Sequence, residues 1–344
     1  MPRHAAVTGW GHYAPEKVLT NRDLEGMLDT SDEWIRTRTG ICERRIAAHD
    51  ETTSTMCAIA AQRALDKAHM AAIDLDLIIC ATTTPDTLMP ATACLVQDSI
   101  GAANAGAFDL NTACTGFVYG LVMASQFIQS GAYDRVLVVG GETLSRFLNW
   151  QDRTTCILFG DGAGAVVLEA TEDESGLLSF VLGSQGSGGP LLTIAGGGAA
   201  KPASPETVAA GDHYLYMRGN EIFKFAVRSM VQAAGEALTK AGLTQEDVRV
   251  VVPHQANVRI LRATQEALGL PWESVFVNVD RYGNTSAASV GIALSECADL
   301  GMLRPGDNLL FIAFGGGLTW ASAVMRWADV DAIVAAREES PNVI

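Results

Sequence analysis

One internal repeat constrains the fold of this chain more than any other feature. The segment ALDKAHMAAIDLDLII, which begins at Ala64, returns 173 positions later as ALTKAGLTQEDVRVVV. The same spacing aligns Val136 with Leu309, and each of them lies in an apolar run that is typical of a buried strand. Repetition of a helix, a strand and the distance between them indicates a duplicated unit. We therefore predict two halves, residues 1–172 and 173–344, which form one compact unit.

Within each half, helical and strand patterns alternate. Residues 54–70 place apolar side chains three and four apart, as a helix does, whereas residues 74–84 and 135–142 are apolar runs. Strands that are apolar on both faces indicate a mixed sheet covered by helices on both sides. Two such halves stacked face to face predict a five-layered α/β/α/β/α arrangement.

Three further segments have an expected place in this arrangement. A long helix over residues 220–241 has apolar residues over a wide arc, so we expect it to be buried between layers. Residues 186–212 are rich in glycine, proline and alanine, and we expect them to form a long connection between the halves. The segment after Trp327 is expected to be a short peripheral helix with a polar end.

Charge and cysteine content argue against several classes of function. The formal net charge of −15 argues against nucleic acid as the main partner. The seven cysteines are odd in number and form no CxxC pair, so we expect neither a disulfide framework nor a zinc cluster, and reduced thiols suggest the cytoplasm. We see neither an apolar signal-peptide region nor an apolar stretch long enough to span a membrane.

A cysteine at the start of a helix is the first candidate for chemistry. Residues 108–131 have the pattern of a strand end, a tight turn and a helix, with Cys114 at the turn. The positive end of the helix dipole and the free N–H groups there favour the thiolate, which is the nucleophilic form. The competing interpretation is a small buried core residue. We expect the helix after Cys114 to lie between the two sheets, with its dipole directed at the sulfur.

The second half supplies two polar residues at comparable turns. His254 follows an apolar strand in VVPHQANVRI, and Asn284 comes before a helix in DRYGNTSAASVGIAL. Equivalent loops of a duplicated α/β fold meet at one face, where such proteins place their sites. A cysteine beside two neutral donors suits acyl chemistry through an oxyanion. Taken singly, His254 is as well explained as a structural histidine, and Asn284 as a turn residue.

Together these motifs resemble a known enzyme family. The motifs are NTACTGF, VPHQANVRI, RYGNTSAASV, FGDGAGA and AFGGGLTW, and they occur in the order that the family has. They resemble the β-ketoacyl-acyl-carrier-protein synthase III family, the condensing enzymes that initiate type II fatty acid synthesis and have the thiolase-like fold. The likeness covers roughly residues 4–327.

The resemblance implies an acyltransferase with a ping-pong mechanism and no metal or redox cofactor. Cys114 would take the acyl group of an acyl-CoA primer, after which malonyl-acyl-carrier protein would lose CO₂ and attack the acyl-cysteine. A neutral His254 and Asn284 would stabilise the enolate. The N–H groups of Cys114 and Gly316 would hold the oxyanion of acyl transfer. Phe223 matches an aromatic residue near the cysteine that favours decarboxylation.

The resemblance also implies binding residues. Trp34 and Arg153 match a pair that sandwiches the adenine of CoA. Arg38 matches a residue at the tunnel mouth, and Asn257 one that contacts the pantetheine arm. The residues matched to contacts with the acyl-carrier protein are Gln255, Ala256, Asn257, Val258, Arg259 and Lys224.

An acidic carrier needs a local basic patch on a chain that is itself acidic. The candidate residues for this patch are Lys224, Arg228, Arg259 and Arg262. An ordinary solvated face is the competing interpretation. Glu266 and Ala267 stand where some members of the family carry lysines, which leaves the strength and geometry of docking open.

Met89 matches a position that reaches across a homodimer interface to close the partner's acyl pocket. Because methionine is flexible, we predict a primer pocket that is not restricted to acetyl groups. There are two alternative functions. One is a related condensing enzyme or acyltransferase of secondary metabolism with the same three residues, and the other is a non-catalytic partner subunit. Retention of Cys114, His254 and Asn284 together argues against the second.

Overall fold

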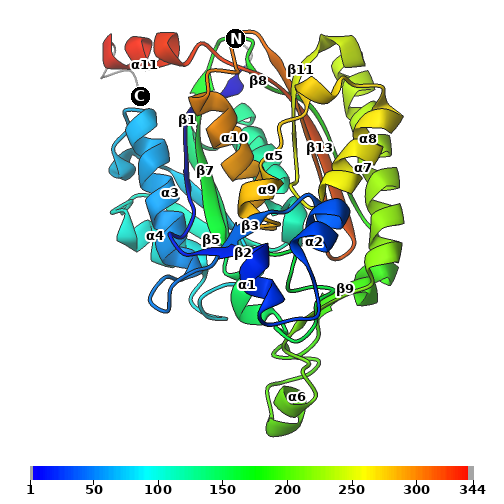
Figure 1. Ribbon diagram of the computed structural model, residues 1–344. Helices are drawn as coiled ribbons and strands as arrows, with labels where there is room; N and C mark the ends of the chain where they lie inside the picture. The colour runs from blue at the N-terminus through cyan, green and yellow to red at the C-terminus, as the bar shows by residue number, and fades with distance from the viewer. Residues whose placement is uncertain (1–2, 340–344) are drawn as a thin grey trace.

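The computed structural model describes residues 3–339 and contains two mixed sheets side by side (Figure 1). The strand order is β1-β7-β6-β4-β5 in the first sheet and β8-β13-β12-β11 in the second. The first sheet consists of β1 (His4–Tyr13), β4 (Leu77–Ala81), β5 (Gly106–Leu110), β6 (Arg135–Glu142) and β7 (Gly162–Thr171). The second consists of β8 (Gly176–Ser184), β11 (Val248–Pro253), β12 (Asn308–Gly315) and β13 (Thr319–Arg326).

The two sheets repeat one topology. Counted from the β1 edge of the first sheet and the β8 edge of the second, the first three strands pair antiparallel with their neighbours. The fourth strand of each sheet is parallel to the third. β5 adds a parallel fifth strand to the first sheet, and its counterpart in the second is a parallel bridge between Val251 and Val275. β6 and β12 are 173 positions apart, which is the spacing of the sequence repeat. The expected duplicated fold is therefore confirmed, while the division at 172/173, between β7 and β8, stays a prediction.

Two helices fill the layer between the sheets. α5 (Gly116–Gln129) and α10 (Ala288–Asp299) share one hydrophobic cluster with residues of both sheets. Alternate residues of the same strands point outward into separate clusters under the outer helices, which gives the five layers. The helix after Cys114 therefore lies between the sheets, as predicted.

The outer layers are helices with one solvated side. α3 (Thr53–Lys67) and α4 (Thr92–Ser99) cover the first sheet, and α7 (Gly219–Ala241) and α8 (Val258–Leu268) cover the second (Figure 1). The expectation that α7 is buried between layers is wrong. Phe225 and Met230 face the sheet, but Lys224 and Arg228 are exposed. The apolar arc seemed wide because half-buried residues such as Val227 flank the buried side.

Two insertions, one in each half, extend beyond the layers. The first half inserts β2 (Val18–Thr20), α1 (Asn21–Glu25), α2 (Asp32–Thr39) and β3 (Glu43–Arg45) after β1. The second inserts β9 (Leu192–Ile194), α6 (Pro205–Ala209) and β10 (Leu215–Met217) after β8, as an arm with α6 at its tip (Figure 1). Residues 186–212 therefore do not connect the halves, as their composition suggested, because β8 already belongs to the second sheet.

The remaining helices are short. α9 (Val279–Tyr282) precedes α10, and α11 (Val330–Glu339) runs along the end of the first half, where Arg337 forms an ion pair of 2.7 Å with Glu169. Within residues 3–339, no helix is both long and apolar enough to cross a membrane.

Candidate active site

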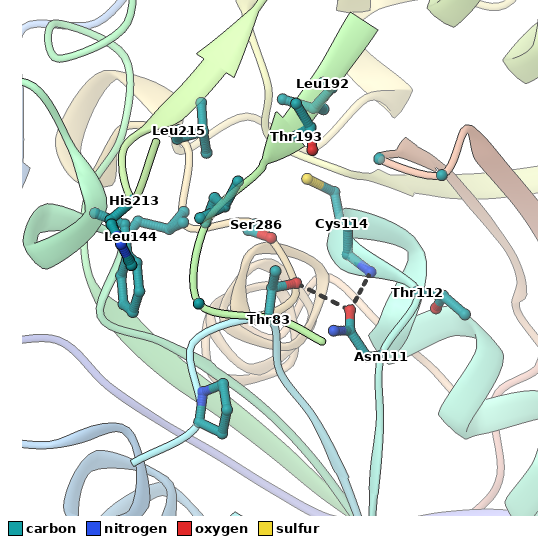
Figure 2. Close-up of a pocket in the computed structure, with 18 of the residues that line it drawn as sticks. Thr83, Asn111, Thr112, Cys114, Leu144, Leu192, Thr193, His213, Leu215 and Ser286 are labelled. Atoms are coloured by element: carbon teal, nitrogen blue, oxygen red, sulfur yellow. Dashed lines mark hydrogen bonds between the residues drawn. The ribbon is translucent and has the colours of Figure 1, made fainter. Parts of the chain in front are cut away.

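Cys114 lies on a short 3₁₀ turn, Ala113–Thr115, between β5 and the central helix α5. Ala113 has a φ of +51°, a left-handed conformation that is uncommon without glycine and often found at functional sites. The turn presents Cys114 to a cavity of about 750 Å³, where its side chain is only 6% exposed (Figure 2).

The cavity beside Cys114 is mainly apolar. Its larger side chains are Leu88, Leu144, Phe147, Phe159, Leu192 and Leu215. The glycine segment 196–198 and His213, from the inserted arm, line it as well. Figure 2 shows Ser286, Thr193 and Cys114 in the wall of this cavity, and Asn111 hydrogen-bonded to Thr83. Such a cavity suits an acyl chain that is attached at its polar end.

Burial decides the resting state of the cysteine. It raises the pKa of Cys114 to about 12, although a hydrogen bond with the Ser286 hydroxyl acts in the opposite direction. The helix start was expected to favour the thiolate, but desolvation of the sulfur outweighs the stabilisation available there. Removal of the thiol proton has to accompany the reaction.

His254 is held behind the end of β12. Its backbone N–H donates to Ile312 O (2.8 Å), its Nδ1 shares a 2.7 Å hydrogen bond with Ser289 Oγ, and its ring packs edge-on against Phe314, with 5.5 Å between centroids. The Nε2 atom is buried and has no hydrogen-bond partner among residues 3–339. Burial lowers the pKa of His254 to about 3, so the ring is neutral at physiological pH.

Asn284 is fixed by its backbone and by one oxygen. Its N–H donates to Leu158 O (2.8 Å), and its carbonyl accepts from Gly160 N–H (3.0 Å). Its Oδ1 accepts from Ser286 N–H (2.9 Å). The Nδ2 amide is therefore the part of the side chain that remains to donate to a substrate.

Of the three predicted residues, only Cys114 is among the residues that line the cavity. Asn284 is linked to the cavity through Ser286, and His254 through Phe314, which precedes Gly315. A Cβ atom on Gly315 would lie 2.8 Å from the Cys114 nitrogen, so the end of β12 presses against the cysteine. Gly316 lines the cavity, as its expected oxyanion role requires.

Ser286 and Glu142 belong to the site and were missed from the sequence. Ser286 lies in the cavity wall and donates a 3.0 Å hydrogen bond to Glu142, the last residue of β6. The position of Ser286 two residues after Asn284 was a usable signal. No local signal in the sequence indicated Glu142, because its contact with Ser286 joins residues that are 144 positions apart.

The residues predicted to bind CoA lie together at the surface. The guanidinium carbons of Arg153 and Arg38 are 5.4 Å and 4.7 Å from the centroid of the Trp34 ring. Since Arg153 already stacks on Trp34, an adenine enters between them only if they separate. Asn257 caps α8 by accepting from Arg259 N–H, and its Nδ2 donates to Arg38 O (3.2 Å).

The residues predicted to contact the carrier protein are divided between surface and core. Lys224 and Arg259 are exposed on α7 and α8, and Val258 is half-buried. Gln255 and Ala256 are buried, so their side chains offer little surface for the predicted contact. The side chain of Gln255, 1% exposed, is occupied by hydrogen bonds to backbone groups that include Phe276 O and Asn278 N–H.

Two further predictions concern Phe223 and Met89. Phe223 is half-buried on α7 with Arg259 at 5.8 Å from its ring, and it is not among the residues that line the cavity of Cys114. Met89 and its neighbour Leu88 are 87% and 89% exposed on the loop before α4. Leu88 also lines the cavity, so this exposed loop borders the site.

The structure offers no cluster for a metal. Over residues 3–339, no three or more His, Cys, Asp or Glu side chains are arranged to hold an ion. All seven cysteines are free.

Comparison with known proteins gives one consistent family. The family model of 3-oxoacyl-[acyl-carrier-protein (ACP)] synthase III matches residues 108–186, and the model of its C-terminal part matches residues 238–327. The β-ketoacyl-[acyl-carrier-protein] synthase III of Roseiflexus sp. (strain RS-1) is 55% identical over 327 residues, which are 95% of this chain and 99% of that protein.

Solved structures agree with the sequence relatives. The 3-oxoacyl-[acyl-carrier-protein] synthase III of Aquifex aeolicus VF5 has a TM-score of 0.87 and 49% identity, over 94% of this chain and 100% of that one. The priming β-ketosynthase of the R1128 polyketide pathway has a TM-score of 0.89 and 36% identity, over 95% of this chain and 97% of its own.

Proposed function

The chain belongs to the 3-oxoacyl-[acyl-carrier-protein] synthase III family, and on that premise we propose that Cys114 is the nucleophile that carries its acyl intermediate. The activity is that of a condensing acyltransferase. An acyl-CoA primer acylates the cysteine, and decarboxylative Claisen condensation with malonyl-acyl-carrier protein then gives a 3-oxoacyl-acyl-carrier protein, CoA and CO₂. The alternative in secondary metabolism is not favoured, since identity to the polyketide priming synthase is only 36%.

In the first half-reaction, the Cys114 sulfur attacks the thioester carbon of the primer and the CoA sulfur leaves. The acyl chain extends into the apolar cavity beside the sulfur. The N–H groups of Cys114 and Gly316 donate to the tetrahedral oxyanion, which is where fixed donors lower the barrier most.

In the second half-reaction, His254 and Asn284 act on the malonyl thioester. The neutral ring of His254, through Nε2, and the Nδ2 amide of Asn284 donate to the thioester oxygen. They stabilise the enolate that forms as the carboxylate leaves as CO₂. The enolate carbon then attacks the acyl-cysteine, and the cysteine leaves as the thiolate.

One observation carries the proposal: a buried cysteine at the wall of an apolar cavity, in a chain whose His254 Nε2 has no hydrogen-bond partner among residues 3–339 and whose Asn284 amide is held by its oxygen. Peptide mass spectrometry after mixing with acetyl-CoA tests it. The acetyl mass should appear on the peptide that contains Cys114 and be lost in Cys114→Ala. Acetylation of another cysteine in the wild type would overturn the assignment.

Substrate binding would use other residues, at the surface. We infer that Trp34, Arg153 and Arg38 bind CoA, and that Lys224 and Arg259 contribute to a basic surface for the acyl-carrier protein. The homodimer, the cytoplasmic location and the lack of a cofactor stay predictions.

We also propose a primer range wider than acetyl. The cavity of about 750 Å³ has leucine side chains in its wall, and in the predicted homodimer the flexible Met89 of the other chain would close it. Initial rates with acetyl-, isobutyryl- and octanoyl-CoA should be of comparable size for at least two of the three. A strict preference for acetyl-CoA would contradict the proposal.

A further inference from the structure

Glu142 is a fully buried carboxylate whose environment calls for an explanation. It ends β6 with 0% exposure. Among residues 3–339 it is in no ion pair, and its hydrogen-bond partners are backbone N–H groups and hydroxyls of Thr82, Thr83, Thr84 and Ser286. A buried carboxylate without a cation is costly to ionise, and burial raises the pKa of Glu142. The group is therefore suited to take up a proton.

Ser286 connects this carboxylate to the nucleophile. It lines the same cavity as Cys114, its hydroxyl is close enough to the sulfur to lower the pKa of the thiol, and it donates to Glu142 Oε1 at 3.0 Å. Its backbone has a φ of +47°, which a serine rarely adopts, and its N–H is held by Asn284 Oδ1. Ser286 is 3% exposed and is held in this conformation, so its hydroxyl stays bonded to the carboxylate in the wall of the cavity that contains the thiol.

We propose that Ser286 relays the thiol proton of Cys114 to Glu142 when the enzyme is acylated. This inference rests on the proposed role of Cys114 as the nucleophile. Ser286 contacts the reacting sulfur, and Glu142 is the positioning residue behind it.

The relay balances without any further reactant. The Cys114 S–H bond breaks and its proton binds Ser286 Oγ, while the original hydroxyl proton of Ser286 moves to Glu142 Oε1. The products are a thiolate, an intact serine and a carboxylic acid, so one negative charge has moved from oxygen to sulfur. After acyl transfer the CoA thiolate takes up one proton, which returns Glu142 to the carboxylate.

His254 is the competing proton acceptor, and the structure favours Glu142. Ser286 is the neighbour whose hydroxyl lowers the pKa of the thiol, whereas Nε2 of His254 has no hydrogen-bond partner among residues 3–339. Burial lowers the pKa of His254 to about 3, which makes the ring a weak base. Glu142 and Cys114 repel each other as like charges when both are ionised, so they share one negative charge. Cys80, on β4, is the other titratable group that interacts with Glu142.

The pH dependence of thiol reactivity distinguishes a relay from a structural role. If the proton moves within the protein, alkylation of Cys114 by iodoacetamide should reach a plateau between pH 6 and 9, because the thiolate fraction no longer depends on bulk pH. In Glu142→Gln the amide accepts no proton, so the rate should rise about tenfold per pH unit without a plateau. Acylation by acetyl-CoA at pH 7 should slow by about 10²- to 10⁴-fold, as expected for loss of a general base.

Three further variants keep the test decisive. Ser286→Gly is compatible with the positive φ and removes the hydroxymethyl group that carries the hydroxyl, so it should also lose the plateau, even if Glu142→Gln fails to fold. Glu169→Gln, a buried carboxylate on β7 away from the cavity, should keep it. A parallel rise with pH in the wild type and Glu142→Gln would overturn the relay. So would loss of the plateau in His254→Ala alone.

The same samples separate this inference from the proposed function. Peptide mass spectrometry shows which cysteine is labelled. Labelling of another cysteine would contradict the role of Cys114, whereas labelling of Cys114 at an unchanged rate in Glu142→Gln would contradict only the relay.

Discussion

Burial keeps both the cysteine and the histidine of this site uncharged near neutral pH. It raises the pKa of Cys114 to about 12 and lowers that of His254 to about 3. The neutral thiol and the neutral imidazole have different roles. The sulfur must lose a proton before it attacks, whereas the ring needs only to donate one hydrogen bond. The two half-reactions therefore depend on different residues.

Substitution of the two donors should separate the half-reactions. His254→Ala and Asn284→Ala should still acetylate Cys114 but lose malonyl decarboxylation by about 10²- to 10³-fold, which is typical for removal of one oxyanion donor. The measurement is CO₂ release from malonyl-acyl-carrier protein by enzyme acetylated beforehand. An equal loss of both half-reactions in either variant would contradict the division.

His254 should also make stability depend on pH. Its pKa is about 3 in the folded chain and about 6.5 when unfolded, so below pH 6.5 the unfolded chain binds a proton that the folded chain does not. The free energy of unfolding should therefore fall as the pH falls from 6.5 towards 3, by up to about 1.4 kcal/mol per pH unit. Urea unfolding at pH 7 and pH 5 measures this, and His254→Gln should show a weaker dependence. Identical dependence in both proteins would show that His254 does not contribute.

Motifs located the nucleophile and the donors, but not what surrounds them. Cys114, His254 and Asn284 stand in short runs that can be compared with a family. The partners Glu142 and Ser286 meet only because two distant strand-to-helix turns are brought together in space. A motif can also suggest a functional contact for a residue with a structural role. Gln255 follows His254 in such a motif, but its side-chain amide forms hydrogen bonds with backbone groups of the chain.

At the scale of elements, close packing of the central layer against the first sheet positions the site. α10 passes so near β7 that a Cβ atom on Gly164 would lie 2.4 Å from the backbone of Gly291. Two backbones meet there, so neither can yield as a flexible side chain would.

Gly164→Ala should therefore destabilise the fold by about 1–3 kcal/mol or more, as overpacking does. Gly235→Ala, on the outer helix α7, has nothing within 4 Å of the added carbon. That control should be neutral or more stable by up to about 1 kcal/mol, because alanine favours the helix. Chemical denaturation measures both. An equally stable Gly164→Ala protein would contradict the close contact.

Repetition predicted the strands and their sheets better than it predicted the insertions. Strands repeat at a fixed spacing because each must pair with the same neighbours in its own sheet. The arm of residues 186–212 has no such constraint, and its composition alone did not tell an insertion from a connection. The predicted position of α7 was wrong for a related reason. An apolar arc indicates that a helix packs against something, but it does not indicate whether one layer or two layers cover the helix.

At the scale of the whole molecule, the exposed loop before α4 indicates a second subunit. Leu88 and Met89 are 89% and 87% exposed, although Leu88 also borders the cavity that contains Cys114. Two large apolar side chains left in water beside a site suit an interface. We predict a homodimer in which Met89 of one chain closes the cavity of the other, and sedimentation equilibrium should give twice the mass of 36.3 kDa.

Mixed dimers test whether Met89 acts across that interface. Cys114→Ala has no nucleophile, and Met89→Asp should have little activity because a charge replaces the apolar closure. When the two chains are co-expressed, the Met89→Asp chain keeps Cys114 and receives an intact Met89 from the Cys114→Ala chain. Random pairing makes half of the dimers mixed, with one working site each, so activity should return to about a quarter of the wild type. If Met89 instead closed the cavity of its own chain, neither chain of a mixed dimer would hold a complete site, and co-expression would restore nothing.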